Sequence, residues 1–91
     1  MTAPLVRPLP EYIEKAGTKR VLALQVGMII PSPRGFSVYP ADERYAAFEL
    51  SEDTVAELDL SVGDYLVWTE GEPVQCCGPV EFEAYFRLAA D

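Results

Sequence analysis

The longest apolar stretch of the chain runs from Val21 to Pro31 and is broken by Gln25. A helix that spans a bilayer needs about 20 apolar residues, so this stretch is too short to cross a membrane. It is rich in Val, Leu and Ile, which favour extended backbone. The sequence therefore predicts a strand over residues 19–30 as the strongest element, ended by the Pro- and Gly-rich turn that begins at Pro31.

Further strands are expected where short apolar runs lie between turn residues. They cover residues 36–39, 45–50, 65–69 and 74–77, with a hairpin turn at 70–72. In the run that begins at Tyr65, alternation places Tyr65 and Val67 on one face and Leu66 and Trp68 on the other.

Three stretches predict helices. Ser51 is suited to cap the start of a helix over residues 52–58, where two acids follow in the first turn. Pro79 suits the first position of a final helix, and apolar residues recur at helical spacing over 82–89. Residues 11–16 are also expected to form a short helix, ended by a glycine.

Strands and helices do not alternate along the chain, which indicates the α+β class. The expected architecture is a small twisted antiparallel sheet of four to five strands with one short and one C-terminal helix. A length of 91 residues corresponds to one domain. We expect residues 1–18 to form an extended Pro-rich segment and residues 19–91 to form a single α+β domain.

Catalytic and metal-binding patterns are missing from the sequence. The chain has no histidine, so the usual neutral-pH proton carrier and the commonest metal ligand are absent. Its serines have no histidine to activate them, and no phosphate-binding glycine loop occurs. We therefore expect no enzyme, no cofactor and no metal.

The two cysteines, Cys76 and Cys77, are adjacent. A disulfide between neighbours requires a strained ring, so both are expected to be reduced thiols. The first ten residues hold three prolines and lack the long apolar run of a secretory signal. Together these features predict a cytoplasmic protein.

Several short motifs resemble a family of small phage- and prophage-encoded proteins of unassigned function. The resemblance spans residues 19–87 and is carried by Val21-Leu22-Ala23-Leu24-Gln25-Val26-Gly27, Tyr39-Pro40-Ala41-Asp42-Glu43-Arg44-Tyr45, Val62-Gly63-Asp64-Tyr65-Leu66-Val67, Gly71-Glu72, and Phe82-Glu83 with Tyr85. Family members commonly end in Phe-Glu-x-x-Tyr, and this chain is one residue shorter there. The resemblance implies phage origin and life in the cytoplasm of a bacterial host, and it implies no chemistry.

Charge is divided unevenly between the two halves of the chain. Residues 1–44 hold six bases and four acids, whereas residues 45–91 hold eleven acids and the single base Arg87. The formal net charge is −8. Direct nucleic-acid binding is disfavoured, because phosphate contacts require clustered Lys and Arg.

A protein that presents rows of carboxylates can imitate the phosphates of duplex DNA. We therefore hypothesise that the protein inhibits a host DNA-transacting enzyme by occupying its basic groove as a DNA mimic. DNA gyrase is favoured, ahead of a CRISPR effector, RNA polymerase or a nuclease. The expected partner-binding residues are ten acids with two aromatic anchors: Glu49, Glu52, Asp53, Glu57, Asp59, Asp64, Glu70, Glu72, Glu81, Glu83, Tyr65 and Trp68.

The alternative hypothesis is a structural or accessory phage module, such as a virion component or an assembly adaptor, with no inhibitory role. Such a module would associate through an aromatic sheet face. In either case so small a domain gains core by pairing, so a homodimer is expected.

Overall fold

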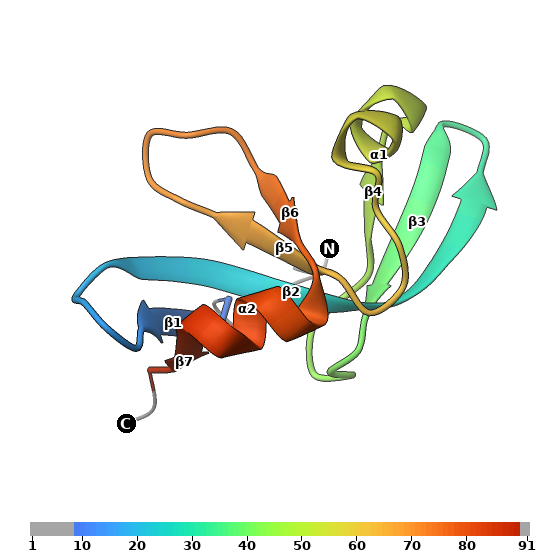
Figure 1. Cartoon of the computed structure of the whole chain (residues 1–91). Coiled ribbons are helices and arrows are strands. Elements are labelled where there is room, and N and C mark those ends of the chain that lie inside the picture. Colours follow the sequence, from blue (N-terminus) through green and yellow to red (C-terminus); the bar gives the residue numbers. More distant parts are fainter. Residues whose placement is uncertain (1–8, 90–91) are drawn as a thin grey trace.

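The computed structural model describes residues 9–89. Its central element is β2 (Arg20–Ser32), a strand of 13 residues that runs across the whole molecule (Figure 1). The first half of β2 pairs with β1 (Glu11–Glu14) on one edge and with β5 (Tyr65–Trp68) on the other. Its second half pairs with β3 (Gly35–Pro40). The strand predicted over residues 19–30 is therefore confirmed, and it is the strand with which β1, β3 and β5 all pair.

All strand pairs in the described chain are antiparallel, and β2 is shared by two parts of the sheet. One part has the order β7–β1–β2–β5–β6, with β6 (Gln75–Cys77) and β7 (Phe86–Leu88) at its edges. The other has the order β2–β3–β4, with β4 (Phe48–Leu50) at its edge. We call these the large sheet and the small sheet.

The two sheets meet where β2 changes partner. Ala23 N–H donates to the carbonyl of Pro10, and two residues later the carbonyl of Gln25 accepts from Ala41 N–H. Because residues two apart present their backbone groups to the same edge of a strand, β1 and β3 follow each other along one edge of β2. The pairing register shifts at Gly27, where a Cβ would lie 2.8 Å from the Cα of Ala41. A glycine is needed here because the two backbones approach so closely.

Two short helices cover the sheets (Figure 1). The first, α1 (Glu52–Leu58), begins as predicted: Ser51 Oγ accepts a hydrogen bond from Thr54 N–H at 3.1 Å. The second, α2 (Pro79–Tyr85), has Pro79 in its first turn, also as predicted. Phe82 is its one fully buried side chain, and it fixes α2 against the large sheet.

The described residues form two apolar clusters on opposite sides of the β2–β5 pair. The first cluster lies under α2 and contains Val21, Ala23, Tyr65, Val67 and Phe82. The second lies under α1 and contains Val26, Val38, Leu60 and Leu66, with Val55 and Leu58 packed against it. The predicted alternation in β5 is confirmed, since Tyr65 and Val67 enter one cluster and Leu66 enters the other.

The α+β class and the antiparallel sheet are confirmed, but the expected count of four to five strands is too low. The described chain has seven strands and two helices. The helix expected over residues 11–16 is wrong, because residues 11–14 form β1. A helix of six residues has little stability of its own, whereas β1 gains hydrogen bonds to both β2 and β7.

The last helix is shorter than expected, and the last strand was missed. At Phe86 the backbone turns extended, with φ −129° and ψ 150°, and β7 pairs with β1. The expected strand over 45–50 is shortened to β4 for a related reason, since its first residues belong to the turn after β3. Pro4 and Pro8 of the expected extended segment lie outside the described residues, and β1 lies in the remainder of that segment.

Candidate functional site

Half of the ten predicted acids lie on or beside α1. Glu52 and Asp53 occupy its first turn, Glu57 its last, and Asp59 follows in the left-handed conformation that ends the helix. Glu49 lies on the adjacent edge strand β4. All five side chains are exposed. They lie within residues 49–59, and we call these five side chains the α1 acidic surface.

The other five acids are divided between two segments and a turn. Glu70 and Glu72 are exposed in the loop between β5 and β6, and Glu81 and Glu83 are exposed on α2. Asp64 differs from them because it is half-buried and bonded within the fold. Its Oδ2 atom accepts from Ser61 N–H at 3.0 Å and from the Cys76 thiol at 3.3 Å.

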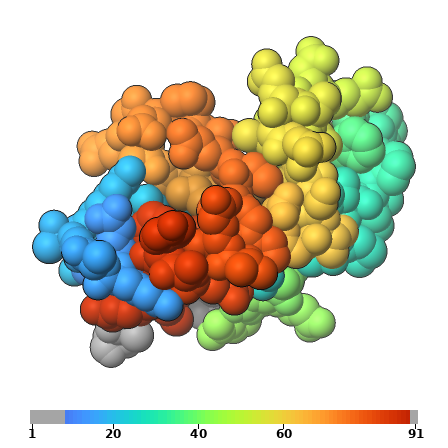
Figure 2. Space-filling view, viewed as in Figure 1, coloured from blue at the N-terminus to red at the C-terminus, as the bar shows by residue number. Residues whose placement is uncertain are grey.

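The three acid-bearing segments share one side of the molecule. Figure 2 shows α1 in yellow, the β5–β6 loop in orange and α2 in red on a single face, flanked by the first half of the chain in blue and green. The segments that carry most of the acids of the second half are therefore visible together from this side, next to segments of the first half.

Ion pairs do not neutralise these acids. Within residues 9–89 the two ion pairs are Arg20–Glu11 at 3.1 Å and Arg44–Asp42 at 2.6 Å, both inside the first half of the chain. Two other cations lie near the acids without pairing: Arg34 lines a shallow hollow with Glu52 and Asp53, and Lys19 lines another with Glu81. The acidic face therefore retains most of its charge.

The two predicted aromatic anchors are placed inside the fold. Tyr65 is 7% exposed and stacks on Phe82, with ring centroids 4.2 Å apart. Trp68 is half-buried and meets Phe48 edge to face at 6.3 Å. Both side chains contribute chiefly to packing, and little of Tyr65 is available to a partner.

Sequence reasoning missed an exposed apolar patch on the outer face of the small sheet. Met28 and Tyr39 are cross-strand partners, and Ile30 lies two residues along β2 on the same face. All three are exposed. Alternation in the second half of β2 is the signal that could have revealed this patch, but the shift at Gly27 disguises it.

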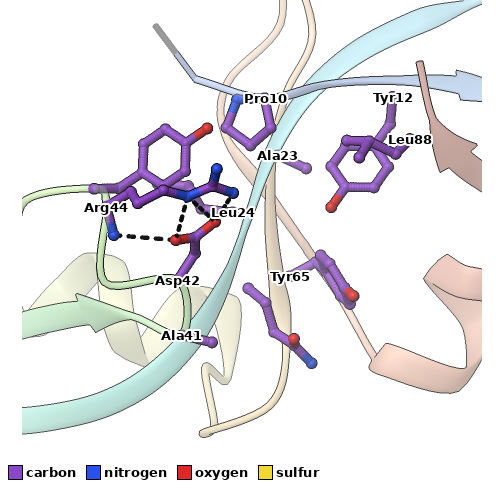
Figure 3. Close-up of a pocket in the computed structure, with 11 residues that line it drawn as sticks. Pro10, Tyr12, Ala23, Leu24, Ala41, Asp42, Arg44, Tyr65 and Leu88 are labelled. Atoms are coloured by element: carbon purple, nitrogen blue, oxygen red, sulfur yellow. Dashed lines mark hydrogen bonds and ion pairs between the residues drawn. The ribbon is translucent and has the colours of Figure 1, made fainter. Parts of the chain in front are cut away.

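Sequence reasoning also missed a hollow of about 370 Å³ on the α2 side of the large sheet (Figure 3). Tyr12, Leu88 and Tyr65 lie on one side of it, Asp42 and Arg44 lie on the other, and Ala23 lies between. Tyr45 and Gln25 complete the polar lining. We call this site the tyrosine hollow, because three of the five tyrosines of the chain line it.

Polar groups of the hollow are held by specific bonds. The Arg44 guanidinium donates hydrogen bonds to the Asp42 carboxylate. Nε lies 3.0 Å from Oδ1 and 3.2 Å from Oδ2, and Nη2 lies 2.6 Å from Oδ2. The Tyr65 hydroxyl donates to Glu83 Oε2 at 2.7 Å. Burial raises the pKa of the Tyr12 hydroxyl, and the nearby Tyr45, Glu83 and Asp42 raise it further. Among the residues that the structure describes, Asp42 and Arg44 are the charged groups that line the hollow, and Glu83 is bonded to one of its tyrosines.

The two cysteines are free thiols on β6. Burial and the Asp64 carboxylate raise the pKa of Cys76 to about 12, and burial and Glu81 raise that of Cys77. A raised pKa leaves little thiolate at neutral pH, so neither sulfur is activated as a nucleophile. Within the described residues no cluster of three or more Cys, Asp or Glu side chains is arranged to hold a metal ion.

No helix of residues 9–89 has the length and apolar character that a membrane crossing requires. Comparison of the chain with protein-family models, with curated proteins and with solved structures found no match.

Proposed function

We propose that the protein inhibits a host DNA-transacting enzyme by binding its positively charged DNA groove as a DNA mimic. The observation that carries this proposal is the α1 acidic surface, where five exposed carboxylates stand close together and take no part in the ion pairs of the described chain. Asp53 and Glu57 lie four residues apart on α1 and repel each other, so a cationic partner at this surface would relieve a cost that the isolated protein carries.

The charge density of this surface supports the proposal. A helix rises about 1.5 Å per residue, so Glu52, Asp53, Glu57 and Asp59 place four negative charges within about 10 Å. Duplex DNA carries about six charges over the same length. The density is therefore comparable to that of DNA, and the acids of the β5–β6 loop and α2 extend it across the face.

DNA gyrase is the first enzyme to test, because a basic saddle wide enough for a duplex suits a broad acidic surface. RNA polymerase, a CRISPR effector and a nuclease follow. The resemblance to small phage proteins supports a bacterial host as the source of the target.

The test is competition with a fluorescent DNA duplex for purified gyrase, followed by fluorescence anisotropy. We expect the protein to displace DNA at low salt and to lose affinity steeply as salt rises, because screening weakens exposed charges. The variant Glu52→Gln/Glu57→Gln is expected to bind at least about tenfold more weakly.

The matched control is Ala16→Lys/Thr18→Lys, which changes the net charge by the same two units on the exposed turn between β1 and β2. This turn adjoins the C-terminal end of α2, where Lys15 N–H donates to the Tyr85 carbonyl at 2.9 Å, and it is not part of the α1 acidic surface. A contact made through that surface should therefore respond less to the lysines than to the loss of Glu52 and Glu57. Equal losses of affinity in the two variants would show that binding depends on net charge and not on the α1 acidic surface. Unchanged affinity in Glu52→Gln/Glu57→Gln would refute the proposed surface.

The second candidate is a structural or accessory phage module. The exposed patch of Met28, Ile30 and Tyr39 favours it, because an unpaired apolar sheet face suits association. A homodimer through this face would scatter light as twice the 10.1 kDa chain. Recovery of the protein in purified particles, with no effect on DNA-binding enzymes, would favour this candidate over the inhibitor.

A further inference from the structure

The outer face of the small sheet carries exposed apolar side chains with a carboxylate beside them. We call Met28, Ile30 and Tyr39 the sheet patch. Ile30 lies opposite Ser37 on β3, and Ser37 lies opposite Glu49 on β4. Because directly opposed residues of antiparallel strands point to the same face, Glu49 stands at the side of the sheet patch. The alternate residues of these strands pack on the other face, under α1 (Figure 1).

A second carboxylate lies at the end of the sheet patch where the pairing register of β2 shifts. Beside this shift is a hollow of about 380 Å³ that Met28, Tyr39 and Glu43 line together. Glu43 and Glu49 are both exposed, and neither belongs to the ion pairs of residues 9–89. The outer face is therefore apolar in the middle and negatively charged at its rim.

The bases that flank these acids in the sequence are directed to other parts of the molecule. Arg44 follows Glu43, but its guanidinium bonds to Asp42, and both residues line the tyrosine hollow. Arg34, in the turn between β2 and β3, lines a hollow with the acids of the first turn of α1. Neither base neutralises the rim of the sheet patch.

Pro31 limits how a partner can bind here. The second half of β2 pairs with β3 along one edge, and among the described strands none pairs with its other edge. An open edge invites the addition of a strand, but a proline has no N–H to donate to one. Pro31 therefore interrupts any ladder along this edge, which leaves the face of the small sheet as the surface for binding.

The charge of the rim decides between two kinds of occupant. Two copies of this chain packed face to face would place four carboxylates around one interface, and like charges oppose such pairing. A basic partner would instead pair with the carboxylates while its apolar side chains cover the sheet patch. We propose that the sheet patch binds a segment of a partner protein in which apolar side chains are flanked by lysine or arginine.

This inference rests on the proposed function, since an enzyme with a basic DNA groove supplies such segments. Glu49 belongs both to the α1 acidic surface and to the rim of the sheet patch, so one partner can contact both. The sheet patch then provides the apolar anchor that Tyr65 and Trp68, which pack inside the fold, do not provide.

The test is an NMR titration of the ¹⁵N-labelled protein with the acetylated and amidated peptide Lys-Leu-Gly-Leu-Lys. Lys-Ser-Gly-Ser-Lys has the same charge without the apolar side chains, and Glu-Leu-Gly-Leu-Glu has the same apolar side chains with the opposite charge. We expect the first peptide to shift the resonances of Met28, Ile30 and Tyr39 with a dissociation constant of about 0.5–5 mM. Both control peptides should bind at least about threefold more weakly.

A variant of the patch tests the apolar contact. Ile30→Thr retains a β-branched residue, which suits a strand, and should weaken binding of Lys-Leu-Gly-Leu-Lys at least about threefold. Leu88→Thr is the matched control, because it changes an exposed apolar residue on β7 and should leave binding unchanged. Equal binding of Lys-Leu-Gly-Leu-Lys and Lys-Ser-Gly-Ser-Lys, or equal losses in the two variants, would overturn the proposal.

A second variant tests the rim. Glu43→Gln/Glu49→Gln should weaken binding of Lys-Leu-Gly-Leu-Lys at least about threefold, and more than the earlier Ala16→Lys/Thr18→Lys control, which changes the net charge by the same two units. Equal effects of these two variants would contradict a role for the rim carboxylates.

Dilution of the protein without peptide tests the other occupant. Patch resonances that shift on dilution in the parent, and not in Ile30→Thr, would assign this face to a second copy and overturn the proposal. Because the peptides replace the partner, the titration does not depend on gyrase. Peptide binding at the sheet patch without DNA displacement would support this docking site and refute the proposed function, whereas DNA displacement without peptide binding would do the reverse.

Discussion

The Tyr65 hydroxyl donates a 2.7 Å hydrogen bond to Glu83 Oε2 and so joins β5 to α2. Tyr65 also stacks on Phe82, one residue before Glu83, with 4.2 Å between ring centroids. One side chain therefore anchors α2 by an apolar and a polar contact together. The same residue lines the tyrosine hollow, which ties the packing of α2 to the shape of the site.

Removal of this hydrogen bond should destabilise the fold measurably. We expect Tyr65→Phe and Glu83→Ala each to lower the free energy of unfolding by about 0.5–1.5 kcal/mol, the usual net contribution of a hydrogen bond, because Glu83 is exposed and water weakens the charged contact. Their double variant should lose less than the sum of the two, with a coupling of about 1 kcal/mol. Urea denaturation of the four proteins measures this cycle, and a coupling near zero would show that the bond does not stabilise α2.

Phe82 is expected to be the residue of α2 on which stability depends most. Its side chain is fully buried and touches Tyr12, Tyr65 and Phe86. Phe82→Leu should cost about 1–3 kcal/mol through lost packing, which is a large part of the stability of a domain this small. Tyr85→Leu is the control on the same helix, and its 65% exposed side chain should cost no more than about 0.5 kcal/mol. Urea denaturation measures both losses. Similar losses in the two variants would contradict the packing of α2 on the large sheet through Phe82.

Elements with strong local signals could be predicted from the sequence. The apolar run of β2, the Ser51 cap of α1 and the Pro79 start of α2 each depend on side chains close to one another in the chain. By contrast, β1 and β7 have four and three residues, and their own sequences do not favour strand over helix. They are extended because each provides the other with a partner, and such pairing between residues far apart leaves no local signal.

The candidate site also has one part that the sequence could predict and one part that it could not. Exposure of the acids on α1 follows from their position in a short amphipathic helix, so the sequence could predict that they face solvent. The tyrosine hollow could not be predicted, because Tyr12, Ala23, Asp42 and Tyr65 come from four segments that only the change of partner on β2 brings together. The sequence could not reveal either that Tyr65 is buried, since aromatic residues suit both cores and interfaces.

Gly35 is expected to tolerate no side chain. Its φ is +145°, and a Cβ there would collide with the carbonyl oxygen of Leu50 while lying 3.0 Å from the Cα of Ser51. Because both atoms belong to the backbone, neither can rotate away. We expect Gly35→Ala to lower the free energy of unfolding by about 2 kcal/mol or more and to disturb the start of α1.

The control for Gly35 is Gly78→Ala at the start of α2. Gly78 has φ −65°, which any residue adopts, and nothing lies within 4 Å of its Cβ position. Its loss should stay within about 1 kcal/mol. Thermal or urea denaturation compares the two, and a Gly35→Ala protein as stable as the parent would contradict the close approach between the β2–β3 turn and α1.

The free energy of unfolding should fall as the pH is raised into the alkaline range. Burial and Asp64 raise the pKa of Cys76 from 9.0 to about 12, and burial, followed by the hydrogen bond to Glu83, raises the pKa of Tyr65 above its ordinary 10.0. The unfolded chain therefore loses these protons first as pH rises, while the folded chain retains them. Since the unfolded state then binds fewer protons, the free energy of unfolding falls with rising pH, starting near pH 9.

The two residues can be separated by variants. Between about pH 8 and about pH 10.5 we expect the parent protein to lose about 1–2 kcal/mol, since the Cys76 thiol retains some solvent contact. In Cys76→Ala the loss over the same interval should shrink, and comparison at neutral pH removes the packing cost of the substitution. Urea denaturation at a series of pH values measures both slopes. A stability that stays level above pH 9 would show that these groups ionise in the folded state as readily as in the unfolded chain, and would contradict the Cys76–Asp64 contact at 3.3 Å.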